Sequence, residues 1–370
     1  MGKSLPMDRV VEKLDGRLRD VPLGEPTFAD ARYAPISFDA GHFHQIPEYE
    51  GDSVLCFLDG GNMEVVSAPN FMIELTRLYF NKYRGKRRLN PNIIPQRIEF
   101  YTICCARPKG NKIIYETELV PVKDEWIELL PESVDMTFNS MDRTLMTGLQ
   151  RASIDVVARS ARVFAEWRLA GLLAERELEK GDILIRDGSL QTFVTNERKY
   201  ANYAYKAAME NGVIFTGLSK TSTLFTSTGQ PLVSAINELS ATSPCSSQAW
   251  YYNPIVHIKQ PDHRAEMYAV KLCPRSSYVF RFEILLDQAE KLRKEEKDLI
   301  IAALSANSKD ISFPGYPYGL IDVDRFARVE MVEREAQELQ FMSAASAKGV
   351  WTKIQRFIKA SDAHVTLNKI

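Results

Sequence analysis

Two short apolar runs, separated by a helical stretch, constrain the fold of this chain more than any other feature. The runs are DILIRDGSL at residues 182–190 and GVIFTGLSKT at residues 212–221, and residues 196–211 between them have a helical pattern. Each run is short, apolar and ends in a polar group, which is typical of a buried strand. This strand–helix–strand unit, together with strand pairs elsewhere, predicts an α/β fold: a mixed sheet flanked by helices.

The remaining pattern predicts one core domain with an extension at each end. A charged helix is expected from Asp8 to Arg19, inside an N-terminal arm of residues 1–50. The core is expected over residues 51–335, followed by a C-terminal helical extension over residues 336–370. Neither an internal repeat nor a long linker divides the core, so we expect a single domain there.

Two hairpins are expected in the core. Residues 53–68 hold two apolar runs around Asp59–Asn62, where Asp-Gly and Gly-Gly supply the positive φ angles of a tight turn. Residues 97–122 predict a second hairpin about Pro108–Gly110, and an amphipathic stretch at 71–83 lies between the two. Further strands are expected at 251–259, 266–273 and 278–284, and helices at 149–179, 286–305 and 321–347.

The composition argues against several classes of protein. The chain has 370 residues, of which 45% are hydrophobic, as in a folded globular protein. It contains neither an apolar stretch of the ~18 residues that span a bilayer nor the apolar core of a signal peptide, so we expect a cytoplasmic protein without a membrane partner. Its five cysteines and five histidines lack zinc-binding spacing, and no P-loop motif for ATP is present.

The charge of the chain gives mixed indications about a nucleic-acid partner. A net charge of −1 at pH 7 provides little long-range attraction for a polyanion. Residues 82–98, however, hold a cluster of basic side chains with Tyr83 among them. This segment fits a phosphate-binding surface and a solvated loop equally well.

Three apolar strands end in a polar group, and these groups are the candidates for chemistry. They are Asp59 in CFLDGG, Asp187 in LIRDGS and Lys220 in TGLSK. Binding sites of open α/β sheets gather at strand ends, and converging carboxylates offer the hard oxygen ligands of Mg²⁺ or Mn²⁺. A pair of such ions clamps the attacking and leaving oxygens of a phosphodiester. The alternative is that both Asp-Gly pairs are turn residues, but the strand-end lysine favours a site.

The helix expected at 149–179 is the natural source of a third carboxylate. Glu166 is the candidate, four residues after Arg162. The alternative is a surface ion pair between the two, worth roughly 0.3–0.5 kcal/mol. Helical phase does not decide the question, and Glu175 and Glu177 remain rivals.

Six motifs in the core resemble those of NurA nucleases, the partners of HerA-type hexameric ATPases, and occur in the same order. Each motif is short, and their common order over residues 50–335 is what makes the resemblance specific. The motifs are FLDGG, the R-x-x-x-E from Arg162 to Glu166, DILIRDGSL, GLSKTS, FRFEI and GYPYGLIDVDR.

The resemblance implies a ribonuclease-H-like fold and a homodimer around a DNA channel. It also implies DNA cleavage that depends on Mn²⁺ or Mg²⁺, exonucleolytic from 5′ ends and endonucleolytic on single strands. The implied pathway is DNA end resection in double-strand-break repair, together with the ATPase. By matching position, the metal carboxylates are expected to be Asp59, Glu166 and Asp187, with Lys220 positioning a phosphate or nucleophile and Tyr316 lining the site.

One position departs from the family pattern, because Asp324 stands where many relatives carry histidine. At ~100° per residue, Asp324 falls within the apolar stripe that includes Leu320, whereas Asp322 falls on the opposite side. We therefore expect Asp324 to face the site and act as a fourth acidic group, and Asp322 to be solvated. The alternative is that Asp324 pairs with an internal arginine such as Arg281.

Two other functions remain open on the sequence alone. The chain resembles an enzyme, but a catalytically silent DNA-binding or clamp subunit of the same ATPase complex would keep the fold. A different ribonuclease-H-like enzyme, such as an Argonaute-like guided nuclease, would need guide-holding modules for which the chain is short. The intact set of carboxylates favours the metal-dependent deoxyribonuclease.

Overall fold

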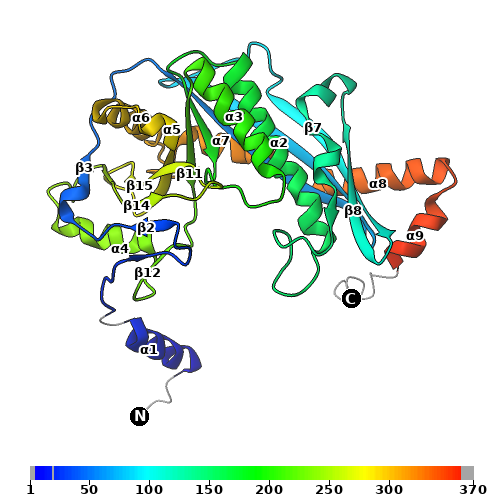
Figure 1. Ribbon diagram of the computed structural model, residues 1–370, viewed down its shortest axis with the longest axis horizontal. Helices are drawn as coiled ribbons and strands as arrows, with labels where there is room; N and C mark the ends of the chain where they lie inside the picture. The colour runs from blue at the N-terminus through cyan, green and yellow to red at the C-terminus, as the bar shows by residue number, and fades with distance from the viewer. Residues whose placement is uncertain (1–4, 19–20, 360–370) are drawn as a thin grey trace.

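The computed structural model describes residues 5–18 and 21–359 and has a mixed α/β architecture with helices on both faces of a large sheet (Figure 1). Within the described residues this sheet has twelve strands. They are β3 (Phe43–Gln45), β4 (Val54–Ala68), β5 (Phe71–Arg84), β6 (Arg87–Leu89), β7 (Arg97–Lys109), β8 (Lys112–Pro121), β9 (Phe138–Asn139), β10 (Ile183–Asp187), β11 (Ile214–Ser219), β13 (Trp250–Tyr252), β15 (Ala265–Lys271) and β16 (Phe280–Leu285).

The strands follow the spatial order β3-β13-β15-β16-β11-β10-β4-β5-β7-β8-β9, with β6 paired to β5. In the centre, β4, β5 and β7 are antiparallel neighbours, while β10 and β11 run parallel to β4. This is the ribonuclease-H-like arrangement that the resemblance implies. Because β10 pairs with Leu55–Leu58 of the much longer β4, it ends beside Asp59, near the middle of β4, and β11 ends next to β10 on its other side.

Nine helices are described. In Figure 1, α2 and α3 lie side by side over one face of the sheet, and α8 and α9 lie at the end of the β7–β8 hairpin. The helices are α1 (Pro6–Leu18), α2 (Ile154–Arg176), α3 (Glu197–Asn211), α4 (Leu232–Leu239), α5 (Leu286–Ala289), α6 (Lys294–Asn307), α7 (Tyr318–Ala327), α8 (Met331–Ala347) and α9 (Trp351–Lys359). Two small sheets pair β1 (Pro26–Thr27) with β12 (Phe225–Thr226) and β2 (Tyr33–Pro35) with β14 (Val256–Ile258).

The sheet separates two apolar cores, and the alternation of β4 shows which face is which. Cys56 and Leu58 are buried in the core that α2 and α3 cover. Leu55 and Phe57, which point the other way, are buried in the core that α6 and α7 cover. Successive side chains of a strand leave opposite faces of its sheet, so a residue's position in the strand determines which helices it meets.

The hairpin expected around Asp59–Asn62 is wrong, because β4 continues through these residues and turns only after Ala68. Among the described glycines, Gly60 and Gly61 are not in the positive-φ group. They are required for close approach: a Cβ on Gly61 would lie 2.3 Å from the Ala327 carbonyl oxygen of α7. Gly60 meets side chains of α2 on the opposite face. The glycines therefore bring two helices against the strand rather than bend it.

Most other expected elements are confirmed, with some broken into two. The hairpin about Pro108–Gly110 is β7–β8, and the helices expected at 149–179 and 196–211 are α2 and α3. The helix expected at 321–347 is α7 and α8, that at 286–305 is α5 and α6, and the strand at 251–259 is interrupted by a cis peptide bond at Asn253-Pro254.

The basic segment 82–98 comprises the end of β5, the short β6, a loop over residues 90–96 and the start of β7. Two of its cations hold the fold together: Lys82 is buried 2.5 Å from Glu177, and Arg88 lies 3.2 Å from Asp322. Of the others, Arg97 lies 2.8 Å from Glu99, and the side chains of Arg84, Lys86 and Arg87, at and around the turn between β5 and β6, are exposed.

The two extensions differ in how they attach to the core. Residues of the N-terminal arm add β1, β2 and β3 to sheets, so the described part beyond residue 20 is integrated into the fold. The described part of the C-terminal extension, in α8 and α9, packs against Val65, Val66 and Leu75 at the far end of the β4–β5 hairpin. Residues 360–370 lie outside the described residues, and the domain boundaries stay predictions.

Two further expectations bear on the surroundings of the protein. In the part of the chain that the structure describes, no helix has both the length and the apolar content to cross a bilayer. All five cysteines are free thiols, and Cys56, Cys104 and Cys245 are buried.

Candidate metal centre and active-site cleft

Asp59 and Asp187 lie side by side because β4 and β10 are parallel and in register. Leu58 pairs with Arg186, so the next residue in each strand is an aspartate. Both carboxylates leave the sheet on the face that α7 covers, because they continue the alternation of Phe57 and Ile185. The convergence expected from two strand ends is therefore present, although β10 ends at this point and β4 continues.

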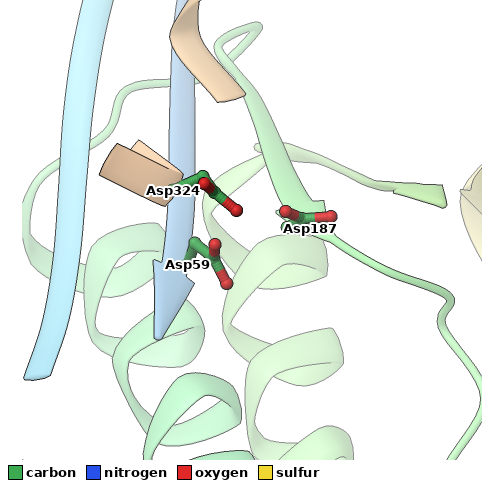
Figure 2. A group of neighbouring side chains, drawn as sticks. All are labelled: Asp59, Asp187 and Asp324. Carbon is green, nitrogen blue, oxygen red and sulfur yellow. The ribbon is translucent and has the colours of Figure 1, made fainter. Parts of the chain in front are cut away.

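Asp324 on α7 brings a third carboxylate to the same place. Figure 2 shows the three aspartates coming together from β4, β10 and α7, and one carboxylate oxygen of each lies within 4.8 Å of the others. The close seat of α7 depends on Gly319, where a Cβ would lie 2.1 Å from the Phe57 ring. Helix, strand and glycine together set the position of Asp324.

Lys220 extends β11 and supplies the positive charge of the cluster. Its Nζ lies 2.7 Å from Asp187 and 2.6 Å from Asp324, and Arg328 adds a second cation 3.0 Å from Asp324. Asp59 accepts a hydrogen bond of 2.7 Å from the Gly60 N–H. Among the described residues, Asp59 forms no ion pair with a lysine or arginine side chain.

This arrangement gives the three carboxyl groups different pKa values. Burial, followed by repulsion from Asp187 and Glu166, raises the pKa of Asp59 well above its usual value. Burial also raises the pKa of Asp187, with Lys220 partly offsetting it. For Asp324, burial is outweighed by Lys220 and then Arg328, so its pKa is lowered. Asp59 is thus the carboxyl that most lacks a compensating cation.

Glu166 lies beside the cluster but approaches from α2, on the opposite face of the sheet. Its side chain is 2% exposed, and its two oxygens accept hydrogen bonds from Arg162 and, at 2.9 Å, from Arg186. Arg186 faces α2 because it precedes Asp187 in β10 and so points the other way. Glu166 is therefore neutralised by arginines, and its role as a metal ligand stays a prediction.

The rival glutamates of α2 have other partners. Glu177 holds Lys82 and accepts hydrogen bonds from the backbone N–H groups of Asn92, Ile93 and Ile94. Glu175 accepts a hydrogen bond of 2.8 Å from the Tyr203 hydroxyl. Neither lines the cleft that contains the aspartates.

Asp324 faces the site as expected, but the expectation that Asp322 is solvated is wrong. Asp322 is 7% exposed and accepts hydrogen bonds from Asn81 at 2.8 Å and Tyr83 at 3.1 Å. The side of α7 that is buried was predicted wrongly because it also includes Gly319, which packs against the sheet: a Cβ at this position would lie 2.1 Å from the Phe57 ring. The alternative pairing of Asp324 with Arg281 does not occur; its partners are Lys220 and Arg328.

The aspartates line a cleft of about 650 Å³ that also contains two arginines. Arg162 donates a hydrogen bond to the Gly60 carbonyl, and Arg281 lies 3.1 Å from Glu283 and donates to the Ser219 hydroxyl. The sequence analysis did not assign Arg281 to the site. The alternation within FRFEI indicates where Arg281 points, because it puts Arg281 and Glu283 on the face of the strand opposite the two phenylalanines.

Tyr316 is buried next to the cluster rather than exposed in the cleft. Its ring centre lies 5.8 Å from the Lys220 Nζ, and within the described residues its hydroxyl has no hydrogen-bond partner. Burial, followed by the charges of Asp187 and Asp59, raises the pKa of Tyr316, so the hydroxyl keeps its proton.

The donor set suits a hard divalent cation. Three carboxylates within 4.8 Å of one another provide only oxygen ligands, which Mg²⁺ and Mn²⁺ prefer, at about 2.0–2.2 Å. The carboxyl group of Asp59 is crowded by two like charges without a paired cation, which a bound metal would relieve. On this observation Asp59, Asp187 and Asp324 fit a metal centre.

Comparisons with known proteins agree with this fold. The model of the NurA domain matches residues 53–329. The NurA nuclease from Sulfolobus solfataricus has a similar crystal structure, with a TM-score of 0.54 and 12% identity, covering 93% of this chain and 95% of that chain. Endonuclease V from Ciona intestinalis, bound to an inosine-containing DNA, has a TM-score of 0.34 with 9% identity over 76% of this chain and 86% of that chain. No curated protein sequence matches. Since the family model covers well over half of its length, this chain belongs to the NurA family.

Proposed function

We propose that this protein is a metal-dependent deoxyribonuclease that hydrolyses phosphodiester bonds in the cleft of Asp59, Asp187 and Asp324. The observation that carries the proposal is the convergence of these carboxylates from β4, β10 and α7 with Lys220 between two of them. Mn²⁺ or Mg²⁺ held there would polarise a phosphodiester and lower the pKa of a bound water. We include Glu166 as a further candidate ligand, which would first have to give up an arginine.

The cations of the cleft would position the DNA backbone. Lys220 is 38% exposed, so its ammonium can contact a phosphate or orient the attacking water while it remains paired to Asp187. Arg162 and Arg281 present guanidinium groups from the other face of the sheet, and each is held by a buried glutamate. Guanidinium groups fixed in this way bind phosphates at little entropic cost.

The protonated hydroxyl of Tyr316 would serve as a fixed donor beneath Lys220. Its proton is retained because burial and the neighbouring aspartates raise its pKa. We propose that this hydroxyl donates a hydrogen bond to the aspartate cluster while Lys220 contacts a phosphate. The added donor would help to keep the carboxylates in place.

We further propose that the protein acts as a homodimer with a HerA-type hexameric ATPase in the cytoplasm, in DNA end resection and double-strand-break repair. Its activities would be single-strand endonuclease and 5′-to-3′ exonuclease. The net charge of −1 supports a partner that delivers DNA, because the chain alone attracts a polyanion weakly.

The proposal is tested by cleavage of end-labelled single-stranded and duplex DNA in Mg²⁺, Mn²⁺ or Ca²⁺, with and without the cognate ATPase. Cleavage should require Mg²⁺ or Mn²⁺, and the ATPase should stimulate duplex cleavage only with hydrolysable ATP. DNA binding without cleavage under every condition would identify a silent clamp subunit instead. Full-rate cutting of duplex ends by a monomer without partner would contradict the proposed complex.

A further inference from the structure

A second cavity opens beside the candidate active site, on the opposite face of the sheet. It has a volume of about 430 Å³, and it shares four lining residues with the cleft: Gln191, Thr223, Leu224 and Arg281. The segment that follows Lys220 forms their common wall. A strand whose phosphate lies near Asp187 would therefore have this cavity within reach.

The cavity is lined by aromatic and apolar side chains. Phe28 and Tyr33 stack on each other with ring centres 5.3 Å apart and planes 9° from parallel. Phe225 also lines the cavity, and it is 48% exposed. Such rings provide flat faces on which a planar ligand can stack.

Polar side chains also line the cavity, and most of its charged groups are fixed by partners: Asp30, for example, lies 2.6 Å from Arg32. Arg281 lies 3.1 Å from Glu283, which lies at the same distance from His263, and the Tyr33 hydroxyl is 2.9 Å from the other ring nitrogen of His263. Burial alone would raise the pKa of Glu283, but His263 and Arg281 lower it to about 2, so the carboxylate stays charged. This chain connects the wall of the cavity to the cleft.

Gln191 is the exception, because its amide is available to a ligand. It lines both cavities, and within the described residues its side-chain amide has no hydrogen-bond partner. An amide offers a donor and an acceptor together, which is the pattern that the edge of a nucleobase presents.

We propose that this cavity is a nucleobase subsite, which holds one unstacked base of the DNA strand while the neighbouring phosphates lie in the cleft. The inference rests on the proposed function and deepens it. A planar ligand with a hydrogen-bonding edge fits a cavity that combines aromatic rings with polar groups at its wall, among them the Asp30 carboxylate and the free amide of Gln191. Such a base must leave the helical stack, so the subsite selects single-stranded or frayed DNA.

The first test measures cleavage of a single-stranded oligonucleotide in which one base at a time is replaced by an abasic site. In the native protein, one position relative to the cut should lower kcat/KM by about 5-fold or more, the range of one base–aromatic stack. Phe225→Ala should lose this dependence, whereas Tyr278→Ala, a comparably exposed aromatic outside both cavities, should keep it. The same dependence in Phe225→Ala and native protein, or no dependence at any position, overturns the proposal.

The second test does not need cleavage, so it separates this inference from the proposed function. Single-stranded DNA carrying the fluorescent base 2-aminopurine at successive positions is bound to the full-length protein without metal. One position should be quenched by stacking, and Phe225→Ala should abolish the quenching. Gln191→Leu should weaken it and serves as the second variant if Phe225→Ala does not fold. Quenching that is equal at all positions, or unchanged in both variants, contradicts a base subsite.

Discussion

The ammonium group of Lys220 lies 2.7 Å from a carboxylate oxygen of Asp187. The lysine thus supplies part of the positive charge that a divalent cation would otherwise provide. The Lys220–Asp187 ion pair links metal binding to the stability of the folded protein, because these carboxylates need a positive neighbour whether or not a metal ion is bound.

Lys220→Met is expected to lower the stability of the metal-free protein and to enlarge its response to metal. Without the ammonium, Asp187 loses its cation and Asp324 keeps only Arg328, so the repulsion among the three carboxylates is less compensated. The melting temperature should fall in chelator, and added Mn²⁺ should raise it more than in the native protein. The control is Lys297→Met, because Lys297 lies 2.6 Å from Glu266 outside the cleft. An equal Mn²⁺ shift in Lys220→Met and native protein would count against this account.

Because the pKa of Asp59 is raised, this residue should make the metal-free protein less stable as the pH rises. A carboxyl group that binds its proton more tightly when folded disfavours the folded state once it ionises. Its contribution is therefore lost as pH rises from the ordinary value of 3.8 through the higher folded pKa. In chelator, the free energy of unfolding of the native protein should fall relative to Asp59→Asn as the pH rises above about 4.

Urea denaturation of both proteins across this range provides the measurement. Groups with lowered pKa values, such as Asp324 and Glu283, have the opposite sign but occur in both proteins. Their contributions cancel in the difference to the extent that the substitution leaves them unchanged. A pH-independent difference would mean that the pKa of Asp59 is not raised.

Glu166→Gln should destabilise the protein both with and without metal, because it leaves two arginines without their buried partner. Removing one member of a buried ion pair costs about 3 kcal/mol, and Glu166 is 2% exposed. Asp155→Asn, at an exposed pair with Arg159 on the same helix, should cost less than about 1 kcal/mol. Urea denaturation measures both. Unchanged metal-free stability with lost Mn²⁺ binding would make Glu166 a metal ligand without a structural role.

Asp322→Ala and Asp324→Ala should have contrasting effects although they are two residues apart. Asp322→Ala leaves the buried groups of Asn81 and Tyr83 without an acceptor, which costs about 1–3 kcal/mol of stability. Asp324→Ala removes one carboxylate of the cluster and should lower cleavage with little change in melting temperature. Thermal unfolding and cleavage are compared for the two variants. Cleavage lost only in folded Asp322→Ala protein would exclude Asp324 from the site.

The sequence predicts those parts of the fold and site that depend on local pattern. Asp59, Asp187 and Lys220 were found because each follows a short apolar run, and parallel strands bring such ends together. The turn at Gly60-Gly61 was wrong because both glycines serve contacts with helices that are distant in sequence. No local pattern carries that information.

The burial of Asp322 and the pairing of Glu166 with Arg186 were missed for the same reason. Helical phase gives the direction of a side chain, but not what occupies that direction. Asp322 is buried because Asn81 and Tyr83 of β5 lie beneath α7. Glu166 is paired because Arg186 alternates with Asp187 across β10. Asn81 and Tyr83 are 241 and 239 residues from Asp322 in sequence, whereas Arg186 is 20 residues from Glu166, on the strand that follows α2.

Single-turnover cleavage of labelled single-stranded DNA by Asp59→Asn protein in saturating Mn²⁺ tests the central claim most directly. The substitution keeps the shape of the side chain but removes the charge of the carboxylate that most lacks a cation. We expect cleavage to fall at least about 100-fold, since metal-ion stabilisation supplies several kcal/mol. Asp155→Asn should cleave like the native protein, and metal-free Asp59→Asn should melt at the native temperature or higher. Cleavage by folded Asp59→Asn protein within a few-fold of the native rate would contradict the metal centre at Asp59, Asp187 and Asp324.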